Sequence, residues 1–123
     1  MITNFNKYLV DFRSPIKKTI KKINKLGGQS LIVVKNKIFF EGILSYYDLR
    51  KAITNGKILE DSISKIYNKK PVFIYSDELN KFYLKYAVKA NKLKVIPVIE
   101  KRNKKVLGLL TPQIIDKLKK KNL

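Results

Sequence analysis

The sequence predicts an α/β fold built from two copies of a β-α-β-β-α unit that share one core. Helix-like and strand-like segments follow one another in the same order twice along the 123 residues. When the two halves are superposed, Val33 falls on Val98 with an offset of 65 residues, and Gly42 falls on Gly108 with an offset of 66. The one-residue difference lies in a turn between two strands. This agreement indicates an internal repeat.

The first repeat begins with a helix, because apolar residues recur at helical spacing until Gly27-Gly28 ends the pattern. The apolar positions are Ile16, Ile20, Ile23 and Leu26. The elements that follow are a strand at 30–34, a turn at 35–37, a strand at 38–44, a helix at 45–56 and a connector at 58–70. Both strands are apolar runs, and the second helix starts at Ser45 and is closed by Asn55-Gly56.

The second repeat follows the same order. A strand at 71–75 leads to a helix that starts at Ser76 or Asp77. The apolar face of that helix carries Leu79, Phe82, Tyr83, Tyr86 and Ala90. The later elements are a strand at 94–100, a turn at 101–104, a strand at 105–110 and a helix at 111–121. In the last helix Thr111 is expected at the N-cap and Pro112 at the first helical position.

The composition argues against an enzyme. The chain has no cysteine and no histidine, which removes thiol nucleophiles, disulfides and the side chains most used for proton transfer and transition-metal binding. Its nine Asp and Glu residues are scattered rather than clustered. No apolar run approaches the ~18 residues of a membrane span, and no signal segment is recognisable. We therefore expect a cytoplasmic protein without catalytic residues, metal or required cofactor.

The formal net charge of +19 has two interpretations. A basic surface of this strength attracts phosphate-bearing ligands and is typical of proteins that bind nucleic acid. The alternative is compositional, because Lys, Asn and Ile dominate the chain and all three are encoded by A/T-rich codons. Arginine, which nucleic-acid binders concentrate beside aromatic residues, occurs three times only. We regard nucleic acid as a less favoured partner than a small anionic ligand.

Three stretches carry a resemblance to a known family. They are SLIVVKNKIFFEGILSYYDLRKAITNG, ILEDSISKIYNKKPVFI and KVIPVIEKRNKKVLGLLT. Together they resemble a tandem CBS-domain pair (a Bateman module), over roughly residues 14–120. The phrase DLRKAI and the connector are most similar to CBS pairs attached to sugar-phosphate nucleotidyltransferases. No glycine-rich catalytic loop accompanies them, so no transferase activity is expected.

The resemblance implies an organisation and a function. A leader would occupy residues 1–13, the first repeat with its connector 14–68 and the second repeat 69–123, packed through their sheets with pseudo-two-fold symmetry. Such pairs bind adenosine nucleotides (AMP, ADP or ATP) in the cleft between the repeats, form dimeric discs and regulate a partner enzyme. A homodimer acting on a nucleotidyltransferase is therefore expected. The alternatives are a structural dimerisation module with a degenerate cleft and a polyanion binder.

The resemblance also assigns roles to residues. Asp48 would accept hydrogen bonds from the ribose hydroxyls, and Ser45 would contact a phosphate with the N-terminal N–H groups of the following helix. In the second repeat Thr111 matches the hydroxyl position, whereas Ile114 stands at the aspartate position. This substitution predicts that the second ribose contact is missing.

The adenine would be held by the first strand of each repeat, for which the corresponding stretches are 12–16, ending at Ile16, and Val72 with Phe73. Pro97 is expected to shape an edge of the sheet beside the cleft; Ile32 stands at its place in the first repeat.

A local interpretation competes with the ligand roles. Ser-x-x-Asp at a strand-to-helix junction is also close to a capping box, in which the serine accepts from the third helical N–H and the acid accepts from the serine N–H. Tyr46-Tyr47 are expected to be partly exposed packing residues rather than a stacking platform. The residues expected at a dimer face are Leu49, Ile53, Ile115 and Leu118.

Overall fold

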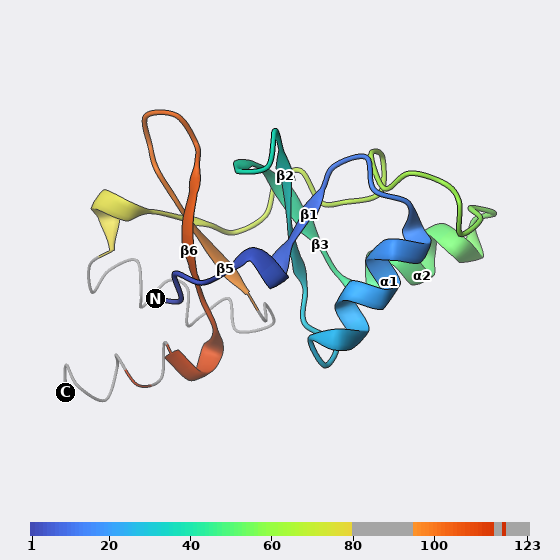
Figure 1. Cartoon of the computed structure of the whole chain (residues 1–123), viewed down its shortest axis with the longest axis horizontal. Helices are drawn as coiled ribbons and strands as arrows, with labels where there is room; N and C mark the ends of the chain where they lie inside the picture. Colours follow the sequence, from blue (N-terminus) through green and yellow to red (C-terminus); the bar gives the residue numbers. More distant parts are fainter. Residues whose placement is uncertain (80–94, 115–116, 118–123) are drawn as a thin grey trace. The chain divides into compact units, whose positions relative to one another are not determined.

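The computed structural model describes residues 1–79, 95–114 and 117. The chain divides into two compact units, Asn6–Pro71 and Met1–Phe5 together with Val72–Leu123. Each unit contains one three-stranded sheet (Figure 1). The predicted α/β class with two repeats is confirmed.

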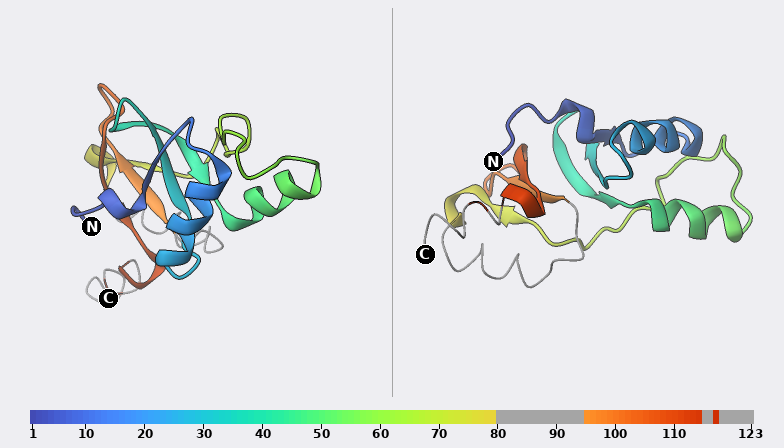
Figure 2. Two further views of the ribbon diagram at one scale, coloured as in Figure 1. Left: turned by 45° about the vertical axis from the view of Figure 1, so that its right-hand side comes forward. Right: turned by 90° about the horizontal axis from the view of Figure 1, so that it is seen from below.

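The unit Asn6–Pro71 pairs its sheet in the order β1-β2-β3, with β1 parallel to β2 and β2 antiparallel to β3. Its elements are a short 3-10 helix η1 (Asn6–Tyr8), β1 (Leu9–Asp11), α1 (Ile16–Lys25), β2 (Leu31–Lys35), β3 (Phe39–Leu44) and α2 (Tyr46–Thr54). The two helices lie side by side (Figure 2). Apart from β1, which the sequence analysis missed, these elements match the predicted ones within two residues.

The second unit repeats this pattern in the order β4-β5-β6, with a parallel and then an antiparallel pair. Its described elements are β4 (Ile74–Tyr75), a short 3-10 helix η2 (Ser76–Glu78), β5 (Ile96–Ile99) and β6 (Val106–Leu110). Leu79 follows η2, and the other four apolar positions predicted for the helix at 76–90 lie outside the described residues. Helical residues follow Thr111, as predicted.

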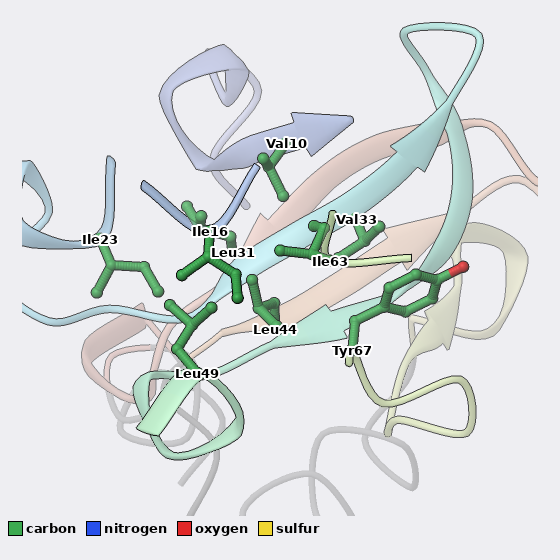
Figure 3. Packing of buried hydrophobic residues seen from close by; sticks show 9 residues of the cluster. All are labelled: Val10, Ile16, Ile23, Leu31, Val33, Leu44, Leu49, Ile63 and Tyr67. Atoms are coloured by element: carbon green, nitrogen blue, oxygen red, sulfur yellow. The ribbon is translucent and has the colours of Figure 1, made fainter. Parts of the chain in front are cut away.

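The core of the first unit is formed by the apolar faces that the periodicity indicated. Ile16 and Ile23 of α1 are fully buried against β2, β3 and α2 (Figure 3). The buried cluster consists of Val10, Ile16, Ile23, Leu31, Val33, Leu44, Leu49, Ile63 and Tyr67. Helix α1 ends where Gly27 and Gly28 adopt positive φ angles of 66° and 86°, a conformation that glycine adopts without steric cost.

The sheet registers confirm the internal repeat. Val33 pairs with Gly42 in the first sheet, and Val98 pairs with Gly108 in the second. The register shifts directly after each of these valines, at Val33/Val34 and at Val98/Ile99. The two repeats therefore agree in strand pairing and in the position of an irregularity, which is stronger evidence than similar composition.

The paired glycines allow a neighbouring backbone to approach each sheet. An ideal Cβ on Gly42 would lie 2.2 Å from the Asn68 carbonyl oxygen, and one on Gly108 would lie 2.6 Å from the Ile2 carbonyl oxygen. Backbone hydrogen bonds of 2.9–3.1 Å join Ile43 to Asn68 and Leu109 to Ile2 in both directions. Ile2 therefore pairs with β6 in the second unit in the same way as Asn68, at the end of the connector, pairs with β3 in the first.

This arrangement changes the expected domain boundaries. The leader predicted over residues 1–13 is divided, because 1–5 pair with β6 and Leu9–Asp11 form β1 of the other unit. The boundary between the units falls after Pro71 rather than after residue 68.

Candidate functional site

The candidate site is centred on the N-terminus of α2. Ser45 is the N-cap residue, and its Oγ accepts a 3.2 Å hydrogen bond from the Asp48 N–H. The Ser45 N–H in turn donates to Asp48 Oδ2 at 2.8 Å, and the Ser45 hydroxyl donates to the same oxygen at 2.9 Å. The capping box that the sequence allowed is therefore formed, and it fixes the carboxylate at the start of the helix.

The capping box leaves half of the Asp48 carboxylate unused. Both hydrogen bonds that the Asp48 carboxylate accepts from Ser45 use Oδ2. Within the described part of the chain no hydrogen bond involves Oδ1, and the side chain is half-buried rather than enclosed. The N–H groups of Tyr46 and Tyr47, the first two of the helix, also have no described partner, as expected at a helix N-terminus. Capping and ligand binding are thus compatible roles for Asp48.

Replacing Ser45 with alanine tests the cap. The substitution removes the acceptor for the Asp48 N–H and the hydroxyl donor to Oδ2, so we expect the free energy of unfolding to fall by ~0.5–2 kcal/mol. Chemical denaturation followed by circular dichroism measures this. Ser45→Thr, which keeps the hydroxyl, is the matched control and should lose less. Equal stability of wild type and Ser45→Ala would show that the box does not stabilise α2.

The second repeat contains the same cap without the carboxylate. Thr111 Oγ1 accepts a 3.4 Å hydrogen bond from the Ile114 N–H, which corresponds to the Ser45–Asp48 contact. Thr111 is 7% exposed. Because Ile114 offers no acceptor oxygen, the two repeats present chemically different helix starts. The second repeat therefore has no side-chain carboxylate at the position that corresponds to Asp48.

Pro97 lies in the central strand β5, so the expectation that it shapes a sheet edge is wrong. In the first repeat the Phe12 N–H donates to the Val34 carbonyl, and alternation along a strand directs the N–H of Ile32 to the same side, toward β1. Pro97 corresponds to Ile32 and has no N–H. This explains why β4 has two paired residues where β1 has three. The backbone before β4, at Val72, therefore loses the donor that Ile32 supplies in the first sheet.

The adenine stretch predicted in the first repeat needs a correction. Val10 pairs with Val33 and Ile74 pairs with Val98, so residues 8–9 rather than 12–16 correspond to Val72 and Phe73. Ile16 itself is 0% exposed within the core of its unit, and its N–H donates to the Asp61 carbonyl at 2.9 Å. Its side chain has no surface for a ligand. The short apolar run YLV before Asp11 was the signal for the true first strand.

Val72 and Phe73 are half-buried residues directly before β4. The Phe73 ring makes an edge-to-face contact with Tyr75, with 5.1 Å between the ring centroids. Of the predicted ligand residues, the structure brings Ser45 and Asp48 together at α2, and it places Val72, Phe73, Pro97 and Thr111 in the other unit.

The outer face of α2 differs from the predicted dimer face. Leu49 is 1% exposed and belongs to the core, whereas Ile53 is 43% exposed as expected. Ile115 and Leu118 lie outside the described residues. Tyr46 and Tyr47 are 47% and 68% exposed, which agrees with the expected partial exposure.

The described residues lack two further features. Among them, no group of three or more His, Cys, Asp or Glu could hold a metal ion. In that same part of the chain, none of the helices has the length and apolarity needed to cross a bilayer.

The fold is that of CBS-domain pairs. A CBS domain pair/ACT domain protein from Thermotoga maritima matches with a TM-score of 0.79 and 14% identity over 100% of this chain and 99% of its own. CBSX2, a CBS-pair protein of Arabidopsis thaliana, in complex with AMP matches with a TM-score of 0.77 and 17% identity over 99% and 93%.

The CBS domain pair of protein MJ0100, in complex with 5′-methylthioadenosine and S-adenosyl-L-methionine, matches with a TM-score of 0.68 and 19% identity over 96% and 98%. No protein-family model and no curated protein matches the sequence. The similarity is therefore one of structure, and it shows the fold alone.

Proposed function

We propose that this chain is a regulatory CBS-pair module that binds an adenine nucleotide. The observation that carries the proposal is the half-used Asp48 carboxylate, which is held by a formed capping box while Oδ1 keeps its lone pairs for a ligand. Two vicinal ribose hydroxyls are suitable donors to such an oxygen. CBS-pair structures of similar fold are described with AMP and with S-adenosyl-L-methionine. Both ligands carry an adenosine group.

The phosphate of the nucleotide is assigned to the start of α2. The N–H groups of Tyr46 and Tyr47 supply donors, and the positive end of the helix dipole favours an anion there. The Ser45 hydroxyl supplies a third donor if it exchanges its hydrogen bond to Asp48 Oδ2 for one to the phosphate. The formal net charge of +19 adds a general attraction for phosphate. We assign AMP, ADP or ATP as the ligand and no catalytic step to the chain.

The adenine ring is assigned to the backbone before β4. Val72 and Phe73 lie directly before β4, and Pro97 has no N–H to donate to the Val72 carbonyl oxygen, which can therefore accept from the amino group of a base. The apolar side chains of these two residues suit the faces of the ring. Because Ile114 replaces the aspartate, the second repeat lacks a ribose acceptor, and we expect the two repeats to contribute unequally.

The nucleotide would act on a partner. A binding module regulates only if its ligand favours one of two conformations that the partner can sense. We propose a homodimer whose partner is an enzyme such as a sugar-phosphate nucleotidyltransferase, the class suggested by DLRKAI and the connector. The exposed Ile53 on α2 is a candidate contact of the dimer.

A thermal-shift panel tests the binding. AMP, ADP, ATP and S-adenosylmethionine are each added to the wild-type chain, with GMP and GTP as controls. A ligand at 100 times its dissociation constant stabilises the folded state by ~2.7 kcal/mol, so a rise in melting temperature with adenine but not guanine nucleotides is expected. Failure of every adenine nucleotide at millimolar concentration would instead favour a structural module with a degenerate cleft.

A further inference from the structure

Helix α1 carries a dense positive charge on its outer side. Its sequence IKKTIKKINK contains five lysines and no acidic residue. Four of these lysines are exposed, at positions 17, 18, 21 and 25. The fifth, Lys22, is partly buried and donates from Nζ to the Leu9 carbonyl. The outer side therefore presents four ammonium groups that have no partner among the described residues.

None of the carboxylates in the described part of the chain forms an ion pair with α1. Asp11 accepts from the Arg13 N–H, and Asp61 accepts from the Ile58 N–H. Asp48 is held in the capping box. Across residues 1–79, 95–114 and 117, the one ion pair joins Lys101 to Glu78, which belong to the other unit. No ion pair within these residues involves α1.

The positions of these lysines destabilise α1. Lys17 and Lys18 lie in the first turn, where the positive end of the helix dipole disfavours cations. Lys17 and Lys21, and Lys21 and Lys25, are spaced i,i+4, at which like charges repel. Burial lowers the pKa of Lys22, and the charge of Lys18 lowers it further. A solvent-exposed helix face does not require so many adjacent lysines. A bound polyanion would reduce the repulsion between their ammonium groups.

The geometry of the helix favours a nucleic acid over a lipid surface as the polyanion. The apolar side of α1 is buried through Ile16, Thr19 and Ile23, so it has no free apolar face to insert into a lipid interface. Lys18, Lys21 and Lys25 follow one stripe at i, i+3 and i+7, and residues 17 to 25 extend over about 12 Å of helix. A nucleic-acid strand of a duplex carries a phosphate every ~3.4 Å along the axis. The stripe thus spans several phosphates.

We propose that the outer face of α1 binds the phosphate backbone of nucleic acid, without sequence preference. The contact is electrostatic, made by lysine ammonium groups, and uses neither the Asp48 site nor the backbone before β4. It is an interaction surface additional to the nucleotide site and does not depend on that site.

The test compares two triple variants of the full chain. Lys18→Gln/Lys21→Gln/Lys25→Gln removes the stripe and keeps good helix formers. Lys57→Gln/Lys65→Gln/Lys70→Gln removes the same charge from exposed positions elsewhere in the unit. Fluorescence anisotropy with a labelled 20-base-pair DNA duplex and a single-stranded RNA of equal length is recorded from low to physiological salt. Circular dichroism confirms that both variants are folded.

We expect the stripe variant to bind about tenfold or more weakly at low salt, and its slope of log affinity against log salt on duplex DNA to be shallower by about 2–3, since each lost phosphate contact removes ~0.9. The control triple should keep a slope close to wild type. Equal losses in both variants would show that net charge alone acts and would overturn the proposal. No measurable binding by wild type would overturn it too, as would equally strong, equally stripe-dependent binding to vesicles containing phosphatidylserine.

Discussion

Replacing Gly42 with alanine is expected to lower the free energy of unfolding by about 1–3 kcal/mol or more. The added Cβ would lie 2.2 Å from the Asn68 carbonyl oxygen and 2.7 Å from Cδ2 of Tyr67. Asn68 is joined to Ile43 by two backbone hydrogen bonds, of 2.9 and 3.0 Å, so it cannot move without breaking a bridge. Tyr67 belongs to the buried cluster. Urea denaturation measures the loss.

Gly27→Asn is the matched control for this prediction. An ideal Cβ at Gly27 meets nothing within 4 Å, and asparagine tolerates the positive φ of 66° better than other side chains. Its free energy of unfolding should therefore change by less than ~1 kcal/mol. If Gly42→Ala were as stable as the control, the close approach of segment 66–70 to β3 would be wrong.

Replacing Asp48 with glutamate is expected to weaken adenine-nucleotide binding about tenfold or more while the melting temperature of the free protein stays nearly unchanged. Ser-x-x-Glu is a well-attested capping box, so the cap at Ser45 is kept. Hydrogen bonds from two ribose hydroxyls tolerate less displacement of the carboxylate, and one added methylene moves it by about 1 Å. Hydrogen bonds to charged groups are worth ~1.5–3 kcal/mol. Each ~1.4 kcal/mol is a factor of ten in affinity.

Two measurements on the same samples separate cap from ligand residue. Scanning calorimetry of the free variant reports the cap, and titration with the nucleotide found in the thermal-shift panel reports the ligand contact. Ser45→Thr, which keeps the hydroxyl that caps α2, is the control. A variant that loses stability but keeps wild-type affinity would leave Asp48 as a helix cap alone.

Most of the first repeat could be predicted from the sequence because its patterns are strong and local. The spacing of Ile16, Ile20 and Ile23 gave α1, and the apolar runs gave β2 and β3 within two residues. Val33 and Gly42 could be matched to the second repeat because a glycine is required where another backbone crosses the strand. These features depend on side-chain periodicity and close packing, both of which are visible in the sequence.

The errors arose where pairing partners are distant in sequence. Strand β1 has three residues and shows no alternation of its own. Its partner Leu31–Lys35 lies about twenty residues away, so the sequence alone does not distinguish the run YLV from a leader. The same error moved the predicted adenine stretch from residues 8–9 to 12–16 and selected Ile16. Proline is typical of edge strands because it donates no ladder hydrogen bond. Pro97 fits in the central strand β5 because β4 is short and pairs only with Val98 and Ile99, so no strand residue is paired with Pro97 on the β4 side.

Isothermal titration calorimetry with AMP, ADP and ATP tests the central claim most directly, namely that the chain binds an adenine nucleotide through one ribose acceptor, Asp48. Wild type should bind at least one of the three with about one site per chain, because Ile114 supplies no carboxylate in the second repeat. Two equivalent strong sites per chain, or no heat with any of the three at millimolar concentration from a chain shown to be folded, would contradict the account.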